Sequence, residues 1–109
     1  MKDHRFGKIW ADALTQADRD AWISDWALSS IWGDDPEAEV PAERVAELGR
    51  IWDAAHMSTR DLVAASGMTQ AAFADRFLIA KRTVESWCGG KRQPPEHVRF
   101  LLALALDLI

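Results

Sequence analysis

Residues 68–95 read MTQAAFADRFLIAKRTVESWCGGKRQPP, and this stretch predicts two short helices joined by a tight turn. The first helix covers residues 70–77 and follows Thr69, a residue type typical of an N-cap. The second covers about residues 80–88 and stops at the glycine pair Gly89-Gly90, which favours helix termination. A proline pair at 94–95 then predicts the start of another helix, because proline is tolerated in the first turn.

The two predicted helices have clear inner and outer faces. In the first, Ala72, Phe73 and Phe77 are expected to point inward. In the second, Val84 and Trp87 lie three residues apart on one face and are expected to do the same. The remaining polar side chains of the second helix are expected to face outward, and they are Lys81, Arg82, Thr83, Glu85 and Ser86.

A short helix with this outer face suits the major groove of double-stranded DNA. Arg82 and Lys81 can donate hydrogen bonds to guanine O6 and N7, and Thr83 can contact a base edge or a thymine methyl group. Ser86, one turn later, is a further candidate. We therefore expect Lys81, Arg82, Thr83 and Ser86 to read bases.

Three other residues are expected to bind DNA phosphates. Gln70 begins the first helix, where backbone N–H groups also favour an anion. Lys91 and Arg92 follow the second helix, where the duplex backbone would pass. Residues 76–92 hold five Lys and Arg residues and a single acid, Glu85. Such a local basic face on an acidic protein indicates a polyanion partner, with a solvated helix face as the simpler alternative.

Taken together, residues 58–106 resemble the lambda-repressor-like, Xre-type helix-turn-helix family. The resemblance rests on Thr69-Gln70, Ala71-Ala72-Phe73-Ala74, Ile79, the segment 81–87 in the place of the recognition helix, and Gly90-Lys91-Arg92 followed by Pro94. It implies a five-helix domain that binds double-stranded DNA, usually as a dimer on a near-palindromic site. Members of this family are often transcriptional regulators or antitoxins.

Two residues depart from the family pattern. Leu78 stands in the turn between the two helices, where glycine is common. Because leucine is costly at positive φ, it predicts a reshaped turn that tilts the second helix. Cys88 replaces a common polar residue before the glycine pair, which removes a hydrogen-bonding group and leaves the fold intact.

The whole chain has 109 residues and a net charge of -4, and its length fits one domain or a small domain with an appendage. The charge is uneven. Residues 1–56 hold six Lys and Arg against twelve Asp and Glu, whereas residues 57–109 hold seven against five. We predict an all-α protein with an acidic helical extension over residues 1–56 and the helix-turn-helix domain over residues 57–109.

The extension is rich in tryptophan. Helices are expected over residues 6–14, 16–32 and 42–55, the second beginning at Thr15 with Asp18 in the capping-box position and ending at Gly33. An acidic, exposed linker is expected over residues 33–41. The tryptophans are expected to form a helical core or a dimer interface rather than a ligand groove, and they are Trp10, Trp22, Trp26, Trp32 and Trp52.

Several classes of protein are disfavoured. No apolar run reaches the ~20 residues of a membrane helix and the N-terminus lacks a signal-peptide core, so a cytoplasmic protein is predicted. His4, His56 and His97 lack metal-ligand spacing, and the single cysteine rules out an internal disulfide. No phosphate-binding glycine loop, nucleophile elbow or zincin helix is present, so we expect neither an enzyme nor a bound metal or cofactor.

The sequence therefore predicts sequence-specific binding of double-stranded DNA by a homodimeric regulator of transcription. The apolar final helix over residues 96–109 and the extension are the candidates for dimerisation. The alternative is a protein-interaction module or antitoxin that uses the same fold, with residues 1–56 binding a partner protein such as a toxin. Leu78 and the acidic N-terminal half favour that alternative.

Overall fold

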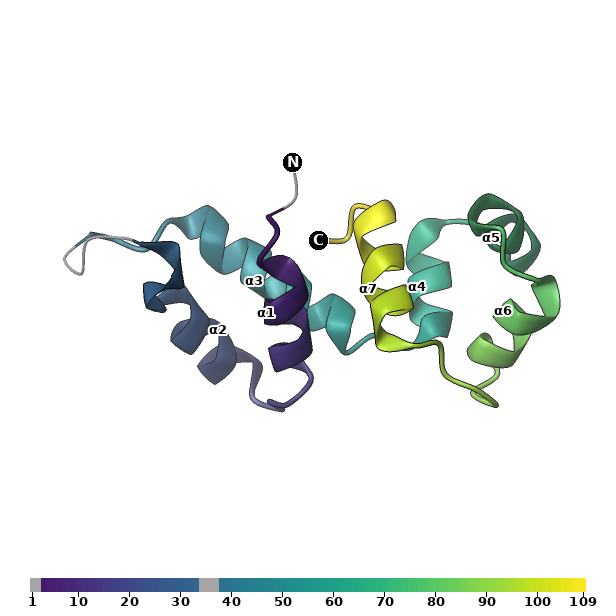
Figure 1. Cartoon of the computed structure of the whole chain (residues 1–109), viewed down its shortest axis with the longest axis horizontal. Coiled ribbons are helices and arrows are strands. Elements are labelled where there is room, and N and C mark those ends of the chain that lie inside the picture. The colour runs from purple at the N-terminus through teal and green to yellow at the C-terminus, as the bar shows by residue number, and fades with distance from the viewer. Residues whose placement is uncertain (1–2, 34–37) are drawn as a thin grey trace. The chain divides into compact units, whose positions relative to one another are not determined.

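The computed structural model of the chain describes residues 3–33 and 38–109, and within them all regular structure is helical. Seven α-helices and one 3-10 turn are present in the described residues, without a strand (Figure 1). The chain divides into two compact units, one running up to His56 and including Ile109, the other covering residues 57–108. The prediction of an all-α fold is confirmed.

The first unit consists of α1 (Phe6–Ala13), α2 (Arg19–Ala27), the 3-10 turn η1 (Ser30–Trp32) and α3 (Ala42–Ala55). Both α1 and α2 pack against α3 (Figure 1). The larger buried side chains of this unit are Phe6, Ile9, Trp10, Trp22, Ile23, Leu48 and Ile51. Helix α3 occupies the predicted range of residues 42–55, because its apolar positions recur at helical spacing.

The predicted helix over residues 16–32 is wrong at both ends. Thr15 is not its N-cap, since its hydroxyl donates to the Asp12 carbonyl at 2.7 Å. Asp18 caps α2 instead, accepting from the Ala21 N–H at 3.1 Å. The helix also breaks after Ala27, where the extended Ser29 caps η1 by accepting from the Ile31 N–H. The competing side-chain bond of Ser29 explains this break.

The predicted linker over residues 33–41 is described only in part. Gly33 closes η1 in the left-handed conformation, with φ 70°, which glycine adopts without steric cost. Residues 34–37 lie outside the described residues. Pro41 then stands at the N-cap position of α3.

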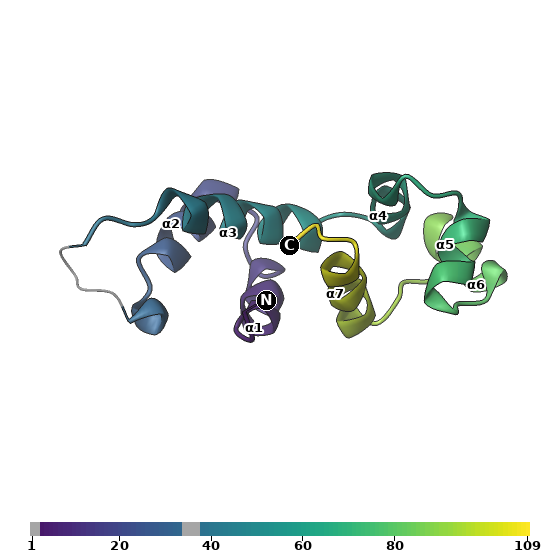
Figure 2. The same ribbon diagram turned by 90° about the horizontal axis from the view of Figure 1, so that it is seen from above.

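The second unit consists of α4 (Thr59–Ser66), α5 (Gln70–Phe77), α6 (Lys81–Cys88) and α7 (Glu96–Ala105). Helix α4 contacts the other three, and α5 lies beside α6 (Figure 2). The core of this unit consists of Val63, Phe73, Ala74, Val84 and Leu102. Because α6 contributes Val84 to that core, its opposite face is left toward solvent.

Local signals define the ends of these helices. Ser58 caps α4 by accepting from the Asp61 N–H, and Thr69 caps α5 by accepting from the Ala72 N–H, each at 3.1 Å. The final helix is shorter than the predicted 96–109. It ends at Ala105, because Asp107 turns left-handed at φ 56° and the Leu108 N–H donates back to the Ala103 carbonyl.

Candidate nucleic-acid interface

The turn between α5 and α6 is set by Leu78. This residue adopts the left-handed conformation, with φ 55° and ψ 40°, and the Ile79 N–H donates back to the Ala74 carbonyl at 3.0 Å. The predicted reshaping is therefore wrong, since leucine takes up the backbone conformation that glycine usually supplies. The leucine side chain is 95% exposed, so little packing offsets its backbone strain of about 1–2 kcal/mol.

Helix α6 is anchored by its inner face. Val84 is fully buried, and Thr83, Ser86 and Trp87 are half-buried. The expected inward position of Ala72 in α5 is wrong, because that side chain is exposed and Ala74 fills the core in its place. The register of α5 thus directs Phe73 and Ala74 toward α6.

The outer side of α6 borders a hollow of about 720 Å³. Residues of α6 and of the loop that follows it line this hollow, and they are Arg82, Thr83, Glu85, Ser86, Trp87, Gly89, Lys91, Arg92 and Gln93. The structure therefore brings together five of the seven residues predicted to contact DNA. Lys81 and Gln70 do not line the hollow; both are exposed, at the first positions of α6 and α5.

The loop after α6 holds Lys91 and Arg92 beside the helix end. Gly90 is left-handed at φ 77°, and the Lys91 N–H donates to the Ser86 carbonyl at 3.1 Å. This bond is the one expected at a helix end closed by a left-handed glycine. Both cationic side chains are exposed. The left-handed turn at Gly90 therefore positions two charges next to the outer face of α6.

Most cationic side chains around the hollow are not paired with other groups of the protein. Within the described residues, the side chains of Arg82, Lys91 and Arg92 make no hydrogen bond or ion pair. Lys81 Nζ lies 3.9 Å from Glu85 Oε1, with both side chains more than half exposed, and such a pair contributes at most about 1 kcal/mol. The surface around the hollow therefore presents charge to solvent.

Helix α6 lacks two features that stabilise the start of a helix. Its N-cap residue, Ala80, has no side chain able to cap, which it shares with Pro95 of α7 but not with Ser58 of α4 or Thr69 of α5. Its first turn carries Lys81 and Arg82, although the positive end of the helix dipole favours acids. Local stability does not explain these choices, and such exceptions tend to occur at functional surfaces.

Four residues that line the hollow have no DNA-contacting role in the sequence-based prediction, and they are Glu85, Trp87, Gly89 and Gln93. Gln93 lines the hollow but was assigned no role, because it lies in a loop between charged and proline residues. Trp87 was assigned to the core, yet it is half-buried and also lines the hollow. Its amphipathic indole was the available signal, since such rings often lie at the margin of a core.

Cys88 is not a candidate nucleophile. Its side chain packs against the core of the second unit. Burial raises the pKa of the Cys88 thiol, with nearby Arg60 acting in the opposite direction. The thiolate is the reactive form, so this thiol is poorly reactive at neutral pH.

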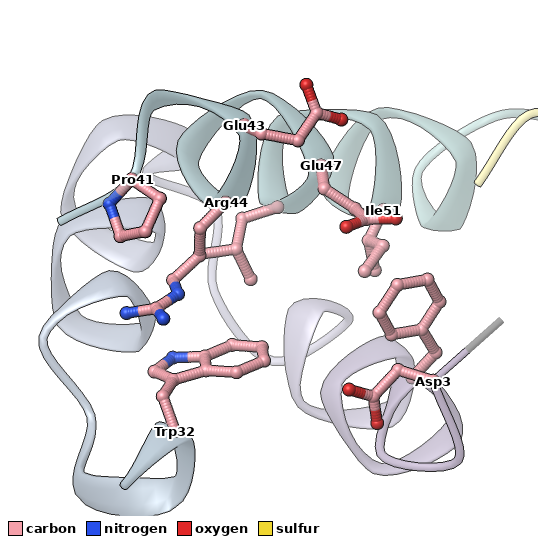
Figure 3. Close-up of a pocket in the computed structure, with 9 residues that line it drawn as sticks. Asp3, Trp32, Pro41, Glu43, Arg44, Glu47 and Ile51 are labelled. Carbon is pink, nitrogen blue, oxygen red and sulfur yellow. The ribbon is translucent and has the colours of Figure 1, made fainter. Parts of the chain in front are cut away.

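The first unit has a separate hollow of about 390 Å³, shown in Figure 3. Its walls include Phe6 and Trp32, and the Arg44 side chain lies beside the Trp32 ring with Cζ 4.7 Å from the ring centroid. Asp3 borders it and is bound by Arg5, whose guanidinium lowers the pKa of that carboxyl to about 2. Glu47 also borders the hollow. Charges of both signs thus surround an aromatic-walled depression.

Among the described residues, His, Cys, Asp and Glu do not gather in threes that could hold a metal ion. Within the same part of the chain, every helix is too short or too polar to span a bilayer.

Comparison of the chain with protein-family models, with curated proteins and with solved structures finds no match.

Proposed function

We propose that this chain binds double-stranded DNA sequence-specifically, as a homodimeric regulator of transcription, with α6 in the major groove. The observation that carries the proposal is the outer face of α6, where unpartnered cations surround one hollow while Val84 anchors the helix from behind. A major groove about 12 Å wide admits an α-helix. The pair α5 and α6, joined through Leu78, corresponds to a helix-turn-helix motif.

The residues divide into two roles. Arg82 and Lys81, with Thr83 and Ser86, are assigned to bases because they lie on α6 itself. Lys91, Arg92 and Gln70 are assigned to phosphates, because they lie at its flanks and at the start of the capped helix α5. Base contacts specify the site, whereas phosphate contacts position the protein.

A binding-site selection with purified protein and random duplexes, followed by titration of two variants, tests these roles. Arg82→Ala should cost about 1–3 kcal/mol on the selected site and relax specificity at one position. Lys91→Ala should weaken binding to all sequences alike and reduce the salt dependence by about one unit. Arg50→Ala, which removes one exposed cation from the first unit, is the charge-matched control. If both variants affected every sequence equally, the groove assignment would be wrong.

The homodimer is tested by the same selection. A two-fold dimer places its recognition helices about 34–36 Å apart and selects a near-palindromic site with half-sites one helical turn apart. The exposed Leu101 of α7 offers apolar surface for such pairing. Selection of a single, non-repeated half-site, together with a monomer mass in sedimentation, would contradict the dimer.

One observation favours a second function, the binding of a partner protein through residues 1–56. The hollow of the first unit has aromatic walls and the Glu47 carboxylate at its border (Figure 3), which suits an apolar side chain close to a cation. Co-purification from the native host, with Glu47→Lys as the disrupting variant and Asp25→Lys as the control, tests this candidate. Recovery of the same proteins by both variants and the wild type would exclude the hollow as the contact site.

A further inference from the structure

Glu85 is the one acid on the outer side of α6, and the structure places it in the candidate DNA interface. It lines the hollow together with Arg82, three residues before it on the helix. Its side chain is 53% exposed. Residues three apart on a helix are neighbours on one face, so both side chains point into the same surface.

Protein stability does not account for an acid at this position. Glu85 lies in the C-terminal half of α6, where the helix dipole disfavours a negative charge. Its pair with Lys81 also runs in the weaker order, since a glutamate preceding a lysine by four residues is preferred to the reverse. The pair therefore adds little, and Glu85 keeps acceptor capacity for an outside group.

A carboxylate on this surface discriminates among bases. An ionised glutamate can only accept hydrogen bonds, while phosphates and most base-edge groups in the major groove are acceptors that repel it. Guanine presents N7 and O6, and thymine presents O4, whereas cytosine presents the N4 amino donor. Adenine also presents an amino donor, N6, but its adjacent N7 acceptor repels a carboxylate. Glutamate therefore selects cytosine by attraction and rejects guanine and thymine by repulsion, and specificity commonly combines these two effects.

The spacing of the two side chains relates their targets. Three residues advance about 4.5 Å along a helix axis, and successive base pairs are about 3.4 Å apart. For a helix lying along the groove, Arg82 and Glu85 can therefore reach neighbouring base pairs. Arginine pairs best with guanine O6 and N7.

We infer that Glu85 is a specificity-determining residue that accepts a hydrogen bond from cytosine N4, at the base pair next to the guanine read by Arg82. This inference rests on the proposed function, because it assigns a target to the same surface. It predicts that the selected site contains two adjacent G·C pairs.

The test is a binding-site selection repeated with wild type, Glu85→Gln and Glu85→Ala. Wild type should prefer cytosine over thymine or guanine at one position by about tenfold or more. Glu85→Gln should move the preference at that position from cytosine to adenine, because glutamine pairs with adenine N6 and N7. Glu85→Ala should abolish it, and both variants should bind random duplex more tightly than wild type because phosphate repulsion is removed.

Asp75→Asn is the matched control, since it removes one exposed acid from α5 in the same unit. It should leave every base preference unchanged, and circular dichroism should show equal helix content for all four proteins. If Glu85→Gln selects the wild-type site with wild-type base ratios, Glu85 is a solvated acid and the inference is overturned. If wild type binds no duplex even at low salt, the proposed function fails instead.

Discussion

The two units differ in how many of their arginines are engaged by the protein itself. In the first unit each arginine is engaged by a carboxylate or an aromatic ring, and these pairs are Arg5 with Asp3, Arg19 with Asp53, Arg50 with Glu43 and Arg44 with Trp32. In the second unit Arg99 is buried and bound to Glu96 and the Met57 carbonyl. Arg82 and Arg92, by contrast, make no hydrogen bond or ion pair within the described part of the chain.

This difference shows which arginines remain free to bind a group outside the chain. A guanidinium already paired with a carboxylate must give up that pair, worth up to about 1 kcal/mol where it is exposed, before it can bind elsewhere. An exposed, unpartnered guanidinium gives up only water. Both units have an apolar core, but the first also pairs each of its arginines with its own groups, whereas the second leaves Arg82 and Arg92 available.

The largest effect is expected from the core of the second unit. Phe73 is fully buried, with its ring centroid 4.8 Å from that of Phe77. Phe73→Ala should lower the free energy of unfolding by about 3–5 kcal/mol, because it leaves a cavity between α5 and α6. Urea denaturation followed by circular dichroism measures this loss. A change below about 1 kcal/mol would show that apolar packing does not hold this unit together.

In the first unit, a second large loss of stability is expected from Asp12, whose carboxylate joins two tryptophans and is called the clamp below. Asp12 Oδ2 accepts from the indole N–H groups of both Trp22 and Trp26, at 3.1 and 2.7 Å. Asp12→Ala should therefore cost about 2 kcal/mol of unfolding free energy, since two donors lose a charged acceptor. Asp25→Ala, which removes an exposed acid of the same unit, should change stability by less than about 0.5 kcal/mol. Equal effects of the two variants would contradict the clamp.

Replacing Leu78 in the turn between α5 and α6 should raise the stability of the protein. Leu78→Gly removes the left-handed strain of an almost fully exposed leucine, so the unfolding free energy should rise by about 0.5–1 kcal/mol after the greater entropy of glycine in the unfolded chain is counted. Asp107→Gly is the matched control, since Asp107 also has a positive φ of 56°. Its unfolding free energy should rise by less, because aspartate tolerates this conformation better than leucine does. A loss of stability in Leu78→Gly would mean that the leucine side chain makes a stabilising contact.

The smallest effect is expected from an exposed ion pair of the first unit. Arg19 Nε donates to Asp53 Oδ1 at 2.8 Å, with both side chains more than 40% exposed. Asp53→Asn should cost less than about 1 kcal/mol, and the loss should shrink further in 1 M salt. The close approach of Arg19 to α3 depends on Gly49, where a Cβ would lie 2.6 Å from Arg19 Nη2. A salt-independent loss above 2 kcal/mol would contradict a screened surface pair.

The extent of sequence-based prediction differs between α5 and α2. The bounds of α5 were predicted correctly, because Thr69 acts on an N–H three residues away and the signal is local. The bounds of α2 were not, since the continuous apolar pattern across residues 16–32 conceals a break. There the Trp32 indole N–H donates to the Trp26 carbonyl at 2.7 Å, a contact that exists only once the chain has turned.

The candidate interface was predictable in its composition but not in its arrangement. Helical spacing placed Val84 inward and Arg82 outward, and the structure agrees. That Lys91 and Arg92 share one hollow with Arg82 depends on the left-handed Gly90 and the bond from the Lys91 N–H to the Ser86 carbonyl. The DNA-binding roles assigned to these residues stay predictions until the selection experiments are done.

The amino-acid sequence by itself determined where most helices begin, and that α6 has one apolar and one cationic side, because capping and helical periodicity act within a few residues. Only the tertiary structure decided that Asp12 accepts from two tryptophans and that Arg19 pairs with Asp53. These bonds join side chains of different helices, so they form only after the helices have packed.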